Sequence, residues 1–158
     1  GKLPDVDGSQ ARGADVDLHV PSLIPDDYLP DVHTRLTLYK RISGARDSEA
    51  LRELQVEMID RFGLLPDAAK HLFAIAELKL QATALGIRKL DLGETGGRVQ
   101  FVEKPDVDPM SIIRLIQGQP KAYQMDGPDK LRVKLELPDA ATRLNAARGL
   151  LALLQNPR

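Results

Sequence analysis

The sequence predicts an α+β fold, in which N-terminal helices are followed by two β-hairpins that form a small sheet packed against helices. Between residues 31 and 86, apolar residues recur three and four positions apart, which is typical of amphipathic helices. Beyond residue 86, short runs of alternating polar and apolar residues are separated by turns rich in glycine or proline, which predicts hairpins. A helical pattern follows each hairpin. The 158 residues are enough for one domain with a core.

The first thirty residues predict a lead-in to the helical region. Residues 1–13 are rich in Gly, Pro and Asp and predict a flexible linker. Residues 15–20 alternate polar and apolar positions, which is typical of a half-buried strand, and the prolines that follow keep the chain extended. We assign residues 14–30 to a strand and a proline-rich connection, and residues 31–156 to a single α+β domain. The strand has no nearby hairpin partner, which suggests that the chain was cut from a larger protein.

Three helices follow in order. The first is expected to begin after the N-cap Asp31 and to end at Gly44. The second spans residues 47–63. The third has Pro66 at its first position and runs to Gly86. Since the third helix is apolar on most sides, we expect it to be the most buried.

Basic residues gather near the C-terminal end of the first helix, namely Arg35, Lys40, Arg41 and, just beyond it, Arg46. Cations at this end stabilise the helix dipole, which is the simpler interpretation. Contact with phosphate is the alternative.

The second half of the chain predicts the sheet and its covering helices. The glycine-rich residues 93–97 join two predicted strands and do not open a helix, so they predict a hairpin turn and not a phosphate-binding loop. In chain order the predicted elements are strands 87–92 and 98–102, a helix from Asp108-Pro109 to Gly118, strands 121–125 and 131–137, and a helix that starts at Pro138.

The composition excludes several classes of function. Lys and Arg number 22 against 23 Asp and Glu, and the resulting net charge of −1 disfavours a dedicated nucleic-acid module. The absence of cysteine excludes disulfides and cysteine-based metal sites. No apolar run is long enough to span a membrane, and the N-terminus lacks a signal-peptide pattern. We therefore expect a soluble, cytoplasmic protein.

The residue patterns of enzymes are also missing from the sequence. The three histidines, His19, His33 and His71, include no pair with metal-ligand spacing. No serine lies in a G-x-S-x-G turn. We expect no catalytic residues, no metal site and no cofactor, and we interpret the chain as a non-enzyme.

The second predicted helix carries the most informative surface. Leu51, Leu54, Met58 and Phe62 share one face, so the opposite face carries Glu49, Glu53, Glu57 and Asp60, with Val56 in their midst. Like charges four apart on a helix cost about 0.2–0.5 kcal/mol each, and no lysine lies within this stripe to relieve them. One interpretation is a docking surface for a basic partner. The alternative is a solvated acidic face with one exposed valine.

Four segments, LIPDDYLPDVHTRLTLYKRI, LRELQVEMIDRFGLLPDAAKHLF, LKLQATALGIRKLDL and YQMDGPDKLRVKL, resemble the C-terminal domain of bacterial transcription-repair coupling factors (Mfd). The resemblance runs from about Asp15 to Leu154. It implies that the chain is one domain of an ATP-driven, helicase-like DNA translocase and that this domain carries none of the motor's motifs.

The resemblance implies a regulatory role in transcription-coupled nucleotide-excision repair. Members of the family bind stalled RNA polymerase and double-stranded DNA, and recruit UvrA through a UvrB-like domain of the same polypeptide. The C-terminal domain is implied to mask that UvrA-binding domain and to restrain the motor, which is autoinhibition.

In the family, acids on the C-terminal domain meet arginines on the UvrA-binding domain. The matching segment here is residues 56–63, which assigns the contact to Glu57 and Asp60; Glu53 and Val56 are added from helix geometry. This hypothesis requires that Glu57 and Asp60 are exposed and are not held by arginines of this chain.

A nucleic-acid-binding accessory domain is the alternative function. Its candidate residues lie in and around the hairpins: Arg98, Lys104, Lys121, Lys130, Arg132 and Lys134. The neutral net charge and the lack of exposed aromatic residues for base stacking count against it.

Overall fold

A computed structural model describes residues 13–156. The linker predicted over residues 1–13 therefore lies almost wholly outside the described residues. Within them, the chain divides into two compact units, which are described separately: the first is Val20–Leu80, and the second comprises Gly13–His19 and residues 81–156. The single domain predicted over residues 31–156 stays a prediction, since compact units do not define the domain bounds of a longer protein.

The first unit is helical, as predicted. It contains α2 (Val32–Ser43), α3 (Ser48–Phe62) and most of α4 (Asp67–Leu85). Its core is aliphatic apart from one phenylalanine and consists of Ile24, Leu29, Leu38, Ile42, Leu51, Leu54, Met58, Leu65, Ala69 and Phe73.

The caps predicted for α2 are confirmed, and α3 is capped in the same way. Asp31 accepts a hydrogen bond from the backbone of Thr34 at 2.9 Å, and Asp47 accepts one from the backbone of Ala50 at 2.8 Å. Each carboxylate satisfies an N–H group that the first helical turn leaves without a partner. Gly63 ends α3 with φ of 99°, a conformation that favours glycine.

Helix α4 is buried at Ala69, Phe73, Leu78, Ala82 and Leu85 and half-buried at most other positions, so it is not the most buried helix, since the shorter α6 (Ala140–Leu154) also has five buried residues. Its exposed residues within Asp67–Leu85 are Asp67, Lys70, Lys79, Thr83 and Ala84. The helix ends before Gly86, whose φ of 79° stops the helical pattern where the sequence predicts it.

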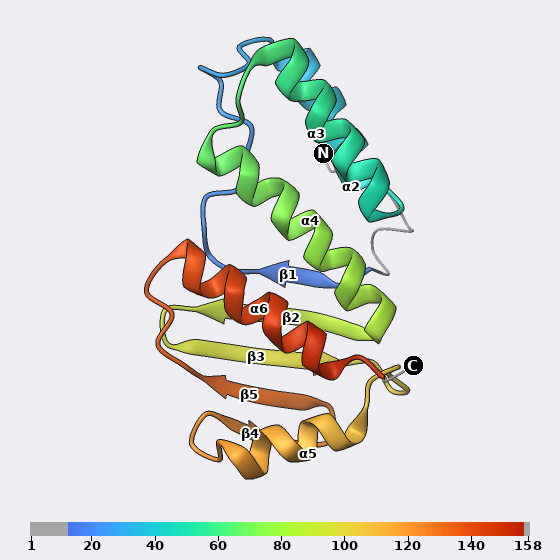
Figure 1. Ribbon diagram of the computed structural model, residues 1–158, viewed down its shortest axis with the longest axis vertical. Coiled ribbons are helices and arrows are strands. Elements are labelled where there is room, and N and C mark those ends of the chain that lie inside the picture. The colour runs from blue at the N-terminus through green and yellow to red at the C-terminus, as the bar shows by residue number, and fades with distance from the viewer. Residues whose placement is uncertain (1–12, 157–158) are drawn as a thin grey trace. The chain divides into compact units, whose positions relative to one another are not determined.

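The second unit is a five-stranded sheet with two helices. Its strands are β1 (Asp15–Asp17), β2 (Ile87–Gly93), β3 (Gly96–Phe101), β4 (Tyr123–Met125) and β5 (Lys130–Lys134), in the order β1-β2-β3-β5-β4. Helix α6 (Ala140–Leu154) crosses one face of the sheet, and α5 (Pro109–Gly118) lies beside β4 (Figure 1). The predicted α+β class and both hairpins are confirmed.

Strand β1 finds its partner far along the chain. It pairs parallel with β2, with Asp15 opposite Lys89. Ala14 donates its N–H to Thr83 Oγ1 at 2.9 Å, and Arg143 of α6 donates to the carbonyl of His19 at 3.1 Å. The strand is shorter than the predicted 15–20, because His19 adopts φ of 55° and leaves the extended conformation.

Strand β5 is also shorter than the predicted 131–137. Beyond Lys134, the N–H groups of Leu135 and Leu137 donate to the carbonyls of Thr95 and Glu94 in the first hairpin's turn. These hydrogen bonds replace those of a continued strand, so the apolar alternation extends past the regular ladder. Among residues 13–156, no helix is long and apolar enough to cross a membrane.

Candidate functional site

The two faces of α3 lie as the periodicity predicts. Leu51, Leu54 and Met58 are buried in the first unit's core, with at most 5% of each side chain exposed. Glu53 and Asp60 are exposed on the other side, and Val56 is 53% exposed between them. The helix therefore presents carboxylates and an apolar side chain on one accessible surface, which we call the acidic face.

Glu57 does not meet the requirement that it be free of this chain's own arginines. Arg41 of α2 donates from both terminal nitrogens to its two carboxylate oxygens, each at 2.8 Å. Arg61, one turn further along α3, donates to the same carboxylate at 3.2 Å. A bidentate arginine is the geometry that best matches a carboxylate, so Glu57 is held by its own unit.

The electrostatics of Glu57 follow from this geometry. The hydrogen bonds from Arg41, with a smaller effect from Arg61, lower the pKa of Glu57 from 4.5 to about 2. In return, the carboxylate raises the pKa of the Arg41 guanidinium. The pair stays charged at neutral pH, but its side chains remain 35% and 45% exposed.

Arginines relieve part of the repulsion between the acids of the stripe, which contains no lysine. Glu49 pairs with Arg52 at 3.1 Å on the same helix, and Glu57 has the two arginines. These arginines lie at the borders of the stripe and on α2, and the contact from α2 forms only when the helices pack together.

Asp60 and Glu53, unlike Glu57, are exposed and are not held by any arginine that the structure describes. Within residues 13–156, neither carboxylate has a hydrogen bond or an ion pair with another side chain. The stripe thus contains two paired acids, Glu49 and Glu57, and two acids that remain open to a partner.

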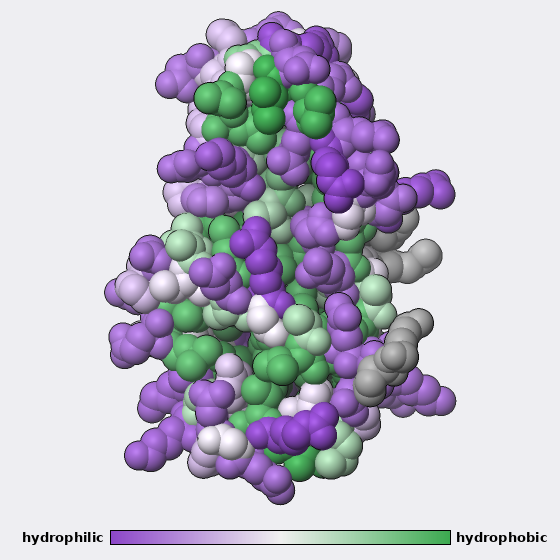
Figure 2. Space-filling model, viewed as in Figure 1, coloured by the Kyte–Doolittle hydropathy of each residue, from purple (hydrophilic) through white to green (hydrophobic). Residues whose placement is uncertain are grey.

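Two exposed apolar residues near the end of α3 were not found from the sequence. Leu64 is 84% exposed directly after Gly63, and Ile59 is 37% exposed on the helix. The sequence does indicate that Leu64 is exposed, because it follows the predicted end of the helix and falls outside the helical periodicity. On the face shown in Figure 2, hydrophobic side chains gather where α3 ends, beside hydrophilic ones along the helix.

A groove of about 490 Å³ runs between α2 and α3 beside the acidic face. Lys40 and Arg41 line it on one side, and Glu53 and Glu57 on the other. Arg41 and Glu57 already pair with each other across the groove, whereas Glu53 has no partner within the described residues and can accept a cation directly.

The predicted basic residues of the hairpins separate into two groups. Arg98, Lys121, Arg132 and Lys134 line one groove of the second unit. Lys130 instead lies 3.6 Å from the carboxylate of Asp129, and Lys104 is not among the residues lining this groove.

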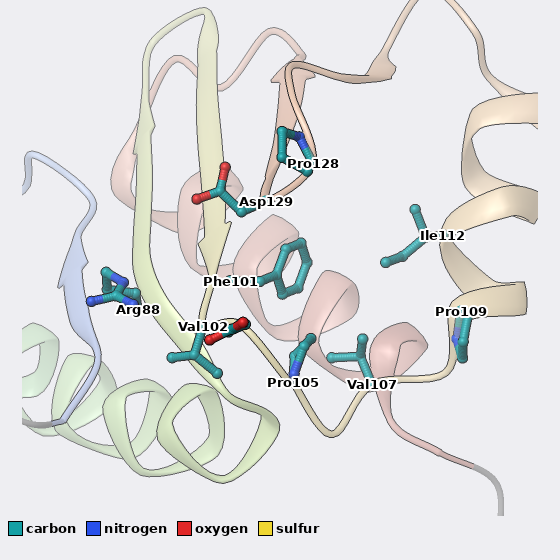
Figure 3. Close-up of a pocket in the computed structure, with 10 residues that line it drawn as sticks. Arg88, Phe101, Val102, Pro105, Val107, Pro109, Ile112, Pro128 and Asp129 are labelled. Carbon is teal, nitrogen blue, oxygen red and sulfur yellow. The ribbon is translucent and has the colours of Figure 1, made fainter.

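A further pocket of about 580 Å³ lies between the end of β3 and α5, and most of its lining is apolar (Figure 3). Phe101, Val107 and Ile112 point toward one another, with Arg88 and Asp129 at the edge. Neither a serine nor a histidine lines it, so it lacks the usual residues of nucleophilic catalysis.

Two of the three histidines hold other parts of the chain. His19 lies 2.8 Å from the carboxylate of Asp91, and His71 Nδ1 lies 2.8 Å from the carbonyl of Pro21. In the part of the chain that the structure describes, no group of three or more acids or histidines could hold a metal ion.

Comparison with known proteins gives the family. A profile of the TRCF domain matches residues 18–112. The transcription-repair-coupling factors of Escherichia coli and Haemophilus influenzae are 45% and 46% identical to the chain over 98% and 91% of its length. A crystal structure of the C-terminal domain of transcription-repair coupling factor has a TM-score of 0.68 at 18% identity, with 90% of this chain and 94% of that one covered.

The helical unit and hairpin sheet therefore form the fold of that C-terminal domain, and the chain belongs to the transcription-repair coupling factor family. It spans only 14% and 13% of the length of the two relatives. The names of these relatives refer to the coupling of transcription with repair.

Proposed function

We propose that the chain is the non-catalytic regulatory C-terminal domain of a cytoplasmic transcription-repair coupling translocase. In this proposal it acts as an autoinhibitory clamp. The acidic face of α3 covers the UvrA-binding, UvrB-like domain of the same polypeptide and restrains the motor. The parent protein would bind RNA polymerase, UvrA and double-stranded DNA.

The observation that carries the proposal is the presence of unpaired acids beside exposed apolar side chains on one helix. Asp60 and Glu53 have no partner within the described residues, and Val56 is 53% exposed between them. Acids around an apolar contact suit a partner that carries arginines and some apolar surface, because interfaces combine an apolar centre with a charged rim.

The paired state of Glu57 changes its part in the proposal. Asp60 and Glu53 supply the charges that a basic partner meets first. Glu57 takes part only if an arginine of the partner replaces Arg41 or Arg61. This exchange forms one charged hydrogen-bonded pair while it breaks another, so its net gain is small.

A clamp of this kind has to be releasable, and its chemistry is suited to release. Contacts between domains of one chain typically bury about 600–1,500 Å² and are partly polar. Exposed ion pairs contribute about 0.2–1 kcal/mol each and weaken as salt rises. Competing contacts made by the working motor can therefore open the closed state.

The proposal is tested by titrating this chain against the separately produced UvrA-binding domain at 50 and 300 mM salt. We expect the dissociation constant to rise with salt, and Asp60→Asn to weaken binding by up to about fivefold at the lower concentration, the value of one exposed ion pair. Asp126→Asn removes the same charge from an exposed turn of the second unit and serves as the control. Binding that responds equally to both variants would contradict the proposal.

A further inference from the structure

The second unit carries a basic groove that the clamp does not use. Its volume is about 1040 Å³, and it is lined by β3, β4, β5 and the residues beside them. Four cations line it, Arg98, Lys121, Arg132 and Lys134, against the single acid Glu136. The near-neutral net charge of the whole chain therefore hides a local excess of positive charge.

The sheet register places these cations together. Arg98 lies directly opposite Arg132 in the antiparallel pair of β3 and β5, and Arg132 lies opposite Gln124 of β4. Side chains at paired positions point to the same face of a sheet, and like charges directly opposite one another destabilise it. An arrangement that costs stability indicates a use for the charge.

The four cations are not neutralised inside the fold. In residues 13–156, none of them forms an ion pair with a carboxylate, and Arg132 donates only to the amide oxygen of Gln124, at 2.8 Å. On the neighbouring strand, Asp91 faces Arg98 in the register, but its carboxylate binds His19 at 2.8 Å. Four guanidinium and ammonium groups thus remain open to an external anion.

The other lining residues favour phosphate over an acidic protein. Protein interfaces usually contain an exposed apolar or aromatic side chain that fills a pocket of the partner. Of the large hydrophobic residues that are exposed in the described chain, none lines this groove. Tyr123 of β4 is buried, with 9% of its surface exposed, so it offers no platform for stacking a base.

We propose that this groove binds the phosphate backbone of duplex DNA without reading its sequence. Phosphate contacts need cations and hydrogen-bond donors but no base-specific groups, which is what the lining provides. Duplex is favoured over single strands because single-strand sites combine charge with aromatic stacking. The inference does not depend on the clamp, since the acidic face belongs to the other unit.

The test is fluorescence anisotropy of this chain with a labelled 20-base-pair duplex between 50 and 200 mM salt. Four phosphate contacts predict a slope of about −3.5 for the logarithm of the binding constant against that of the salt concentration. Arg132→Gln should lower the magnitude of this slope by about one. Arg132→Glu combined with Lys134→Glu should reduce binding at 50 mM at least tenfold.

Lys130→Gln is the matched control, because Lys130 lies on the same strand but pairs with Asp129. It should leave the slope unchanged, and circular dichroism shows whether each variant is folded. The inference is overturned if the folded chain does not bind duplex at 50 mM, or if Lys130→Gln weakens binding as much as Arg132→Gln. Equal affinity for polyglutamate would also overturn it, as would tighter binding to a single strand of the same length.

Discussion

At the scale of single residues, Glu57 is the position where sequence and structure differ most. Helical periodicity places it correctly on the outer side of α3. It cannot reveal Arg41, which is sixteen positions away and reaches Glu57 only because α2 packs beside α3. Arg61 is an i,i+4 neighbour and was open to prediction from the sequence.

The geometry predicts how the titration of Glu57 depends on each arginine. Arg41→Gln should raise the pKa of Glu57 from about 2 toward 4.5, because it removes the largest cause of the depression. Arg61→Gln should raise it by less. The carboxyl ¹³C chemical shift of Glu57 during an acid titration measures both, and Arg52→Gln, whose arginine pairs with Glu49, is the control. A pKa unchanged by Arg41→Gln would contradict the bidentate pair.

The same pair predicts a pH dependence of stability. The pKa of Glu57 is lower in the folded chain than the 4.5 expected after unfolding, so its contribution is complete above pH 4.5. That contribution is lost as the pH falls through about 2. We expect the difference in urea midpoint between the unmodified chain and Glu57→Gln to shrink across this window. A difference that stayed constant from pH 6 to pH 2 would contradict the assignment.

At the scale of elements, the helices were the best predicted because their signals are local. Asp31, Asp47 and Asp108 all accept a backbone hydrogen bond from the first turn of the helix that follows. Gly63 and Gly86 directly follow the last residues of α3 and α4, as their sequence positions predict. Strands were less well predicted, since their ends depend on partners elsewhere in the chain, as at His19 and Leu135.

The cap of α3 can be tested by itself. Asp47→Ala should destabilise the folded chain by about 1 kcal/mol, because the backbone N–H of Ala50 then loses its acceptor. Asp47→Ser retains an acceptor and should recover most of the loss. Urea denaturation measures both free energies of unfolding, and equal values for the two variants would show that the hydrogen bond to Ala50 does not contribute.

Two glycines of the second unit, Gly97 in β3 and Gly149 in α6, should respond oppositely to alanine. A Cβ atom at Gly97 would lie 1.8 Å from the carbonyl oxygen of Asp91, so Gly97→Ala should destabilise the fold by about 1–3 kcal/mol. Gly149 lies within α6 with open space around it, and Gly149→Ala should stabilise by about 0.5–1 kcal/mol. Thermal unfolding of the two variants compares them, and a stable Gly97→Ala variant would contradict the close approach of β2 and β3.

At the scale of the whole molecule, the sequence predicted the α+β class and the acidic face but not the arrangement of the strands. The parallel pairing of β1 with β2 joins residues more than seventy positions apart, and no local pattern encodes it. The net charge of −1 disfavoured a nucleic-acid-binding surface, so the basic groove was not the preferred site. Only the register that sets Arg98 against Arg132 shows that the cations cluster.

The two surfaces give the domain two separate electrostatic properties. The acidic face of α3 lies in the first unit, and the basic groove lies in the second. A basic protein partner and a DNA backbone would therefore bind different residues, so variants of one surface should leave the other's binding unchanged.

The central claim is that the acidic face masks a UvrA-binding domain, and UvrA binding by the parent protein tests it most directly. The decisive variant is Asp60→Arg, because Asp60 is exposed and has no partner in the described part of the chain. We predict that it raises the affinity of the full-length protein for UvrA at least tenfold, while Asp126→Arg does not. A folded Asp60→Arg protein that bound UvrA no more tightly than the unmodified protein would contradict the account.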